Sequence, residues 1–190
     1  MAIKTFNSGE VLTASDTNTY LANAGWNYIT QTTMGTTTSV DNVFSSTYSH
    51  YRIIMSANST TASAFNMRLR TGAGDNSTSN YRWIYFDQNV NASTTAAPSS
   101  ISGWNQTEFY VSNSGNGGSD TAVAWVDVYN PNAAVKTLYM FQTTFEWSGP
   151  SVYNRQGSGQ FNGTTQFTGF SILGSATVTG TLTVYGWRKN

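Results

Sequence analysis

The sequence predicts an all-β protein: an antiparallel β-sandwich of jelly-roll type, preceded by a short N-terminal helix or arm. Three observations predict this fold. Apolar and polar residues alternate from residue 26 to the end of the chain, short clusters of Gly, Asn, Ser and Pro interrupt the alternation, and no second helical pattern follows the first one. We therefore expect a docking arm with a short helix over residues 1–25 and one β-sandwich domain over residues 26–190.

The arm carries the pattern of a single capped helix. Thr13 suits the N-cap because its hydroxyl can accept a hydrogen bond from a free amide of the first turn, and Asp16 lies near the positive end of the helix dipole. Gly25 is suited to end the helix. The residues at helical spacing are Ala14, Thr17, Leu21 and Ala24, with Tyr20 beside them. So short a helix is not stable alone in water, so we expect the arm to dock on another surface.

The body carries about eight to ten strands joined by short turns. The expected strands include residues 51–56, 65–70, 81–86, 109–111, 121–129, 135–147, 166–173 and 178–189. The strand over residues 81–86 is apolar on both faces. The expected turns are residues 71–77, 113–119, 130–132, 148–150 and 156–159, which are rich in Gly, Asn, Ser and Pro.

The composition is that of an assembled and chemically quiet protein. Charged residues make up 9% of the chain, against about 25% in typical globular domains, and nine basic residues balance nine acidic ones. No basic patch is visible, so we expect no nucleic-acid partner. Cysteine is absent, and no signal peptide or apolar run of membrane-spanning length appears, so we expect neither secretion by a signal peptide nor membrane insertion.

The first two dozen residues resemble the opening of many tailed-bacteriophage structural proteins. Those proteins begin with the pattern Phe-x-x-Gly-Glu-Val-Leu-Thr-Ala-Ser-Asp-x-Asn-x-Tyr-Leu, which this chain matches from Phe6 to Leu21. It departs at Thr17, where an apolar residue is more usual, and at residues 22–24, which weakens the docking stripe. The residues that carry the expected docking function are Phe6, Val11, Leu12, Thr13, Asp16, Tyr20 and Leu21.

Three shorter segments look like parts of β-sandwich modules in phage and cyanophage structural proteins. These segments are Tyr51-Arg52-Ile53, Arg68-Leu69-Arg70 and the closing strand over residues 181–189. Ordinary strand chemistry also explains each of them separately. The resemblance implies a virion protein on the particle exterior, either a minor tail or fibre component or a capsid decoration protein. It also implies other phage virion proteins as partners and a homo-oligomer, with a trimer as the family-level expectation.

Catalytic and metal-binding patterns are sparse, so we expect no enzyme, no cofactor and no metal site. His50 is the only histidine and lies at a strand entry, where a structural role is the simpler interpretation. Glu108, Asp127 and Glu146 could form a glycosidase-like carboxylate pair. Pairing with Arg52, Arg68, Arg70 or Arg82 is the alternative for these carboxylates. Residues 74–77 and 117–120 lack the alternating acidic ligands of a tight calcium site and fit turns.

Aromatic residues are the remaining candidates for a binding function. Tryptophan faces flanked by Asn, Gln or Arg could stack on sugar rings of a host-surface glycan, and the candidates near expected loops are Trp104, Asn105, Trp147 and Tyr153. The alternative is that most of these rings form the sandwich core or a subunit interface. Two hypotheses follow: a structural protein that assembles through its arm and its low-charge surfaces, and a glycan-binding tail module.

Overall fold

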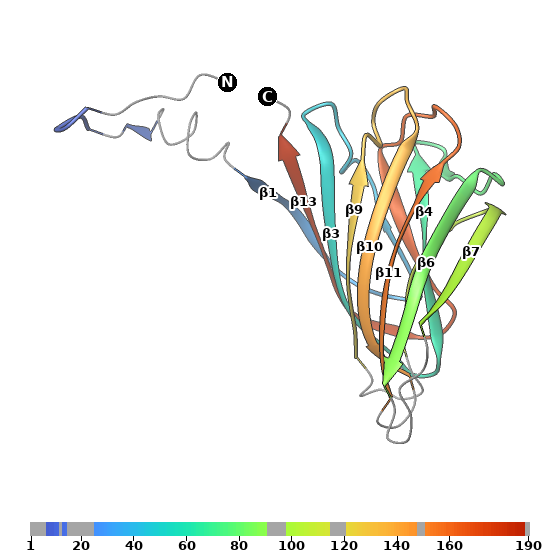
Figure 1. The fold of residues 1–190 in the computed structure, drawn as a ribbon. Coiled ribbons are helices and arrows are strands. Elements are labelled where there is room, and N and C mark those ends of the chain that lie inside the picture. The colour runs from blue at the N-terminus through green and yellow to red at the C-terminus, as the bar shows by residue number, and fades with distance from the viewer. Residues whose placement is uncertain are drawn as a thin grey trace.

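The computed structural model describes residues 7–11, 13–14, 25–90, 98–114, 121–147 and 151–188. This part of the chain is all-β and folds into two antiparallel sheets, in agreement with a β-sandwich (Figure 1). None of its segments is a helix long and apolar enough to cross a membrane.

The larger sheet has eight strands, and its order differs strongly from the chain order. From one edge to the other it consists of β1 (Trp26–Thr33), β13 (Val178–Arg188), β3 (Tyr48–Ser59), β9 (Thr121–Tyr129), β10 (Thr137–Glu146), β11 (Val152–Phe161), β6 (Tyr81–Val90) and β7 (Ser99–Gln106). The last long strand, β13, therefore lies between the first strand and the third. Such pairing of distant segments means that local sequence cannot specify the strand order.

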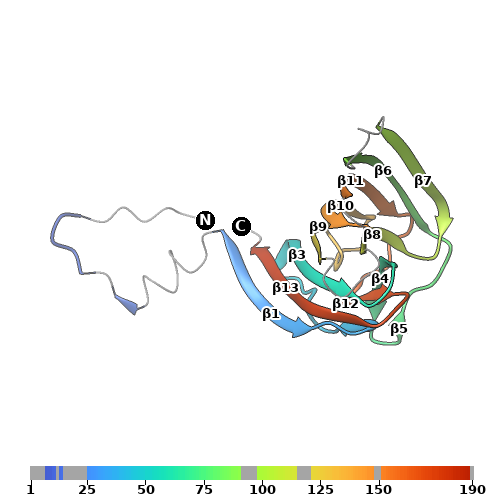
Figure 2. The ribbon, with the colours of Figure 1, turned by 90° about the horizontal axis from the view of Figure 1, so that it is seen from below.

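The smaller sheet packs against the inner face of the larger one (Figure 2). Its strands are β2 (Thr37–Val40), β12 (Gly169–Gly174), β4 (Ser63–Thr71) and β5 (Gly74–Asp75), and β8 (Phe109–Ser114) also pairs with β4. The two inner faces supply alternate residues to one core, as the period of two requires. Ile53 and Met55 of β3, Leu182 and Val184 of β13, and Phe65 of β4 are all at most 1% exposed.

One charged pair lies between the sheets. Arg155 of β11 is 8% exposed and donates a hydrogen bond to Asp87 of β6 at 2.9 Å and another to the Tyr110 hydroxyl of β8. Its guanidinium lies within 5.8 Å of the ring centres of Tyr85, Tyr110, Phe145 and Tyr153. The carboxylate and the ring faces together replace the water that this cation loses on burial.

The structure corrects several sequence-based boundaries. Residues 156–159, expected as a turn, lie in the middle of β11. This expectation was wrong because Gly157 and Gly159 leave space for aromatic rings of the neighbouring strand and do not form a turn. A Cβ on Gly157 would lie 2.6 Å from Phe141 Cε1, and a Cβ on Gly159 would lie 2.4 Å from Tyr139 Cε1. β1, β2, β5 and β7 were also missed, and they are rich in Thr, Ser and Gly.

The expected N-terminal helix falls almost entirely on residues 15–24, outside the described residues. Of the docking residues, Phe6, Leu12, Asp16, Tyr20 and Leu21 also lie outside them. Val11 and Thr13 are described and exposed, and Val11 is 79% exposed. Before them, residues 7–10 form a turn in which the Glu10 amide donates to the Asn7 carbonyl at 3.0 Å.

Candidate functional site

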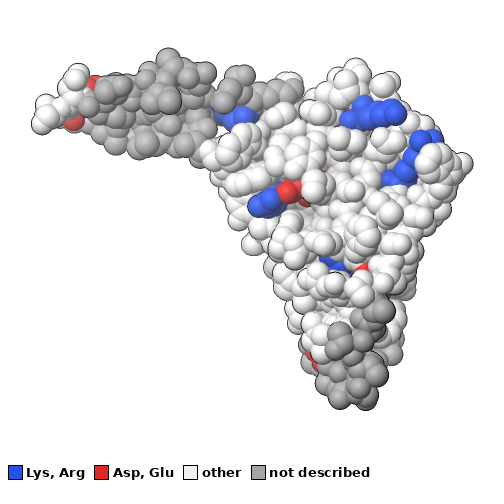
Figure 3. Space-filling model, in the orientation of Figure 1, with Lys and Arg blue, Asp and Glu red and all other residues white. Residues whose placement is uncertain are grey.

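The outer face of the larger sheet is the most unusual surface of the molecule. Large apolar side chains point outward from its central strands, where a solvated sheet normally carries polar residues. The exposed ones are Ile54, Ile84, Phe86, Val90, Trp104, Val123, Trp125, Leu138, Met140, Val152 and Trp187. In Figure 3 most of the face in view is free of Lys, Arg, Asp and Glu. A large apolar surface of this kind marks an interaction site.

The outer face of the smaller sheet is different, because ion pairs cover it. Arg68 of β4 bonds Glu108 at 3.1 Å, and Arg70 bonds Asp41 at 2.8 Å and also Asp75. The Ser39 and Ser171 hydroxyls are hydrogen-bonded beside them at 2.9 Å. Asp75, which the sequence placed in a possible calcium-binding turn, is thus engaged by an arginine. We therefore locate the candidate site on the larger sheet.

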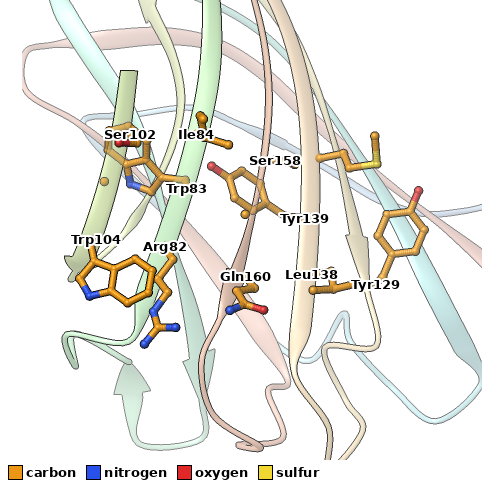
Figure 4. A pocket seen from close by; sticks show the side chains of 13 residues that line it. Arg82, Trp83, Ile84, Ser102, Trp104, Tyr129, Leu138, Tyr139, Ser158 and Gln160 are labelled. Carbon is orange, nitrogen blue, oxygen red and sulfur yellow. The ribbon is translucent and has the colours of Figure 1, made fainter. Parts of the chain in front are cut away.

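A pocket of about 700 Å³ opens on the outer face of the larger sheet (Figure 4). We call it the Trp104 pocket. Its lining residues come from β6, β7, β9, β10 and β11: Arg82, Trp83, Ile84, Ser102, Gly103, Trp104, Tyr129, Leu138, Tyr139, Met140, Ser158, Gly159 and Gln160. Ser158 and Gly159 of β11 lie between larger residues of β10 and β6, and Ser102 and Gly103 of the edge strand β7 lie beyond β6; this difference in size makes the surface hollow.

Strand register brings the walls of the pocket together. In one row across the sheet, Arg82 pairs with Gln160, Gln160 with Leu138, and Leu138 with Tyr129. In the next row, Ile84 pairs with Ser158 and Ser158 with Met140. Since pairing partners point to the same face, these side chains share one surface although they are far apart in the sequence.

Trp104 is held at the rim of the pocket by Arg82. The centre of the Arg82 guanidinium lies 3.8 Å from the centre of the indole ring, and Trp104 is 67% exposed. The next residue, Asn105, has a left-handed backbone with φ of 53°, which Asn tolerates better than most residues. The β6–β7 register shifts between Tyr81 and Trp83. This irregularity lies where Trp104 turns toward Arg82, beside the edge of the sheet.

A second cluster adjoins the pocket through Tyr129. The His50 ring stacks on Tyr129 with centroids 4.1 Å apart, and its Nε2 lies 3.7 Å from an Asp127 oxygen. Arg52 donates two hydrogen bonds to Asp127, at 2.7 and 2.6 Å. These bonds raise the pKa of Arg52, and burial lowers the pKa of His50. His50 thus belongs to an aromatic and ion-paired cluster.

Asp127 does not form a glycosidase-like pair with Glu108 or Glu146, and Glu108, expected in a strand, lies between β7 and β8. Glu108 bonds Arg68 beside the smaller sheet, whereas Asp127 bonds Arg52 on the larger one. Asp127 pairs with Met140, so Glu146 lies six residues further along β10, roughly 20 Å away at about 3.4 Å per residue. Glycosidase carboxylates are about 5 to 9.5 Å apart. Pairing of Glu108 and Asp127 with arginines, the alternative drawn from the sequence, is confirmed.

The four aromatic-site candidates fall into two separate places. Trp104 and Asn105 lie near the end of β7, close to the connection to β8, and Trp104 lines the Trp104 pocket. Tyr153 pairs with Asn89, seven residues along β6 from Arg82, so it lies roughly 23 Å from the pocket by strand rise. Tyr153 stacks on the buried Phe145 at 5.3 Å, and Trp147 contacts the same ring edge-on at 6.3 Å. These two rings belong to the packing at the opposite end of the sheet.

Sequence reasoning missed most of the pocket. Arg82 and Ile84 had a signal, because the expected strand over residues 81–86 was apolar on both faces. Ser158 was hidden in the expected turn over residues 156–159, and Gln160 directly follows that turn. Comparison with protein-family models, curated proteins and solved structures finds no match for this chain.

Proposed function

We propose that the protein is a non-enzymatic structural protein on the exterior of a bacteriophage particle, a tail or fibre component or a capsid decoration protein. In this proposal it assembles as a homo-oligomer, with a trimer as the expected form, and residues 1–25 anchor it to a neighbouring virion protein. The proposed sandwich is of jelly-roll type. In its support, β13 lies between β1 and β3 and β12 lies between β2 and β4, so strands from both ends of the chain alternate in both sheets.

The observation that carries the assembly function is the apolar outer face away from the Trp104 pocket. We call this part the assembly face; it consists of Ile54, Phe86, Val90, Val123, Trp125 and Val152. In register, Ile54, Trp125 and Phe86 lie in one row across the sheet, interrupted by Gln142 and Gln156. Burial of such side chains is favourable by about 25 cal/mol per Å².

A second copy of this chain is the occupant that the charges favour. The six residues of the assembly face are uncharged; Glu146, the register partner of Val152, and the Arg52–Asp127 ion pair lie beside them, and the whole chain has a formal net charge of zero. Copies of the chain can therefore pack against one another through this face without the repulsion that keeps most soluble proteins apart. The neutral Gln, Asn and Thr residues between the apolar ones can hydrogen-bond across such an interface.

Deletion of residues 1–25 tests the anchoring part of the proposal. Particles made with the shortened protein should lack it, since the sandwich would lose its attachment, whereas the full chain should be found by immunogold electron microscopy of intact particles. Label over the head would identify a decoration protein, and label at the tail would identify a tail or fibre component. Incorporation of the shortened protein at the full-length level would contradict the anchoring role.

A second candidate function, recognition of a host-surface glycan, is favoured by the Trp104 pocket. An exposed tryptophan, aliphatic side chains and several hydrogen-bonding groups line one hollow, which is the usual composition of a small-molecule site. Residues 26–190 alone should keep glycan binding under this candidate. The same deletion therefore separates the two functions.

A further inference from the structure

Arg82 differs in its partners from Arg52, Arg68, Arg70 and Arg155. Arg52, Arg68, Arg70 and Arg155 each bond at least one carboxylate. Within the described residues Arg82 has no carboxylate partner, and its Nε is buried without a hydrogen-bond acceptor. A half-buried cation without a counter-ion costs free energy, so a carboxylate supplied from outside would be bound favourably.

Stacking on Trp104 limits the orientations of the Arg82 guanidinium. The two groups stack at 3.8 Å, which favours a fixed plane for a guanidinium on an otherwise flexible side chain. A guanidinium has its N–H groups in one plane, and two of them fit the two oxygens of a carboxylate. The indole therefore keeps the guanidinium of Arg82 in a plane in which two of its N–H groups can bind a carboxylate.

The rest of the pocket has the chemistry of a sugar site. Ser102, Ser158, Gln160 and Tyr129 line it, and none of these side chains has a hydrogen bond to another described residue. Ile84, Leu138 and Met140 supply aliphatic contacts for the C–H faces of a pyranose ring. A pocket of about 700 Å³ admits more than one ring.

We propose that the Trp104 pocket binds an acidic saccharide, with a uronic or sialic acid carboxylate held by two hydrogen bonds from Arg82. In this arrangement Ser158 and Gln160 bind ring hydroxyls, and Leu138 and Ile84 contact the ring. The inference rests on the second candidate function and adds the ligand class to it. An acidic side chain from a second copy would satisfy Arg82, but it would leave the hydroxyl and amide groups of the pocket floor without partners.

The test is an array of uronic- and sialic-acid oligosaccharides, each printed beside its neutral methyl ester, probed with the full chain. We expect the acids to bind and their esters to bind at least tenfold more weakly, since esterification removes the negative charge that strengthens the hydrogen bonds from Arg82. The acid that binds is then titrated by calorimetry against three variants. Arg82→Gln should weaken binding at least tenfold, Arg82→Lys should retain part of it, and Trp104→Ala should reduce it.

Arg68→Gln is the matched control, because it removes the same charge from the opposite sheet and should leave binding unchanged. Equal binding of acids and esters would overturn the acidic class and leave glycan recognition standing. If no sugar binds, both the acidic-saccharide proposal and the glycan-binding function are wrong. An equal loss of saccharide affinity in Arg68→Gln and Arg82→Gln would show non-specific charge attraction, and the proposed binding site would be wrong. A change of oligomeric state in Arg82→Gln without any sugar binding would assign Arg82 to a contact between copies. Unchanged thermal melting of each variant shows that the fold is intact.

Discussion

His50 shows how burial of one residue creates a dependence on pH. Its ring stacks on Tyr129 and contacts Trp26 edge-on at 4.7 Å, and the charged groups that face it are Asp127 and Arg52. Burial is the largest influence and lowers the pKa of His50 below its ordinary 6.5, although Asp127 opposes the shift. The folded protein therefore favours the neutral form of the His50 imidazole more than the unfolded chain does.

The stability of the protein should consequently fall as the pH is lowered from 7.5 to 5.5. With a folded-state pKa below the unfolded value, the unfolded chain takes up the proton first, so the His50 contribution is complete above pH 6.5 and is lost below it. Thermal melting across this range measures the effect. His50→Phe, which keeps a ring against Tyr129, should remove most of the slope because the chain has no other histidine. An unchanged slope in this variant would assign the dependence to carboxylates.

At the scale of elements, β11 is shaped by what lies under it. Gly159 faces the core beneath the Tyr139 ring, and an added Cβ would also lie 2.2 Å from the Arg82 carbonyl oxygen of the neighbouring strand. Backbone atoms cannot move aside as the end of a flexible side chain can. The absence of a side chain at this position therefore allows β6, β10 and β11 to pack with aromatic rings on their inner faces.

Gly159→Ala should destabilise the fold by about 2 kcal/mol or more, because the new methyl group forces β6 and β11 apart. Urea denaturation of the two proteins measures the difference in the free energy of unfolding. Gly72→Ala is the control, since no atom lies within 4 Å of the added Cβ, and it should change stability by less than about 0.5 kcal/mol. Equal effects of both substitutions would refute the packing argument.

On the scale of the whole molecule, the outer faces of the two sheets differ in chemistry. One is covered with ion pairs such as Arg68–Glu108, and the other exposes rings such as Trp125, which is 42% exposed. A sandwich needs only its inner faces to be apolar. The additional apolar face is not required by the sandwich architecture, and this observation supports the proposed self-association.

Trp125→Glu should convert an oligomer into smaller species, because a charge in the centre of the assembly face cannot be buried without a partner. Size-exclusion chromatography with light scattering gives the mass of each species. Thr37→Glu adds the same charge to an exposed position on β2 of the other sheet and should leave the mass unchanged. If the wild-type chain is a monomer at micromolar concentration, the proposed self-association is wrong.

The amino-acid pattern was sufficient for the all-β class and for several strands. Alternation is a local property, so Phe65, Met67 and Leu69 could be assigned to one buried face of β4 without knowledge of its neighbours. It also showed that the strand of Arg82 and Ile84 has a second apolar face. The possible pairing of Glu108 and Asp127 with arginines followed from charge alone.

The Trp104 pocket could not be predicted in the same way. Its walls meet because β6, β11, β10 and β9 lie side by side, and this order depends on the packing of segments that are distant in the chain. Alternation assigns a residue to one side of its own strand but does not say which strand lies next to it. For the same reason β11 was not predicted. Its glycines are typical of a turn in the sequence, and only the structure shows that Tyr139 and Phe141 pack against them. Strand order and register are non-local, and they alone bring Arg82, Gln160 and Tyr129 onto one surface.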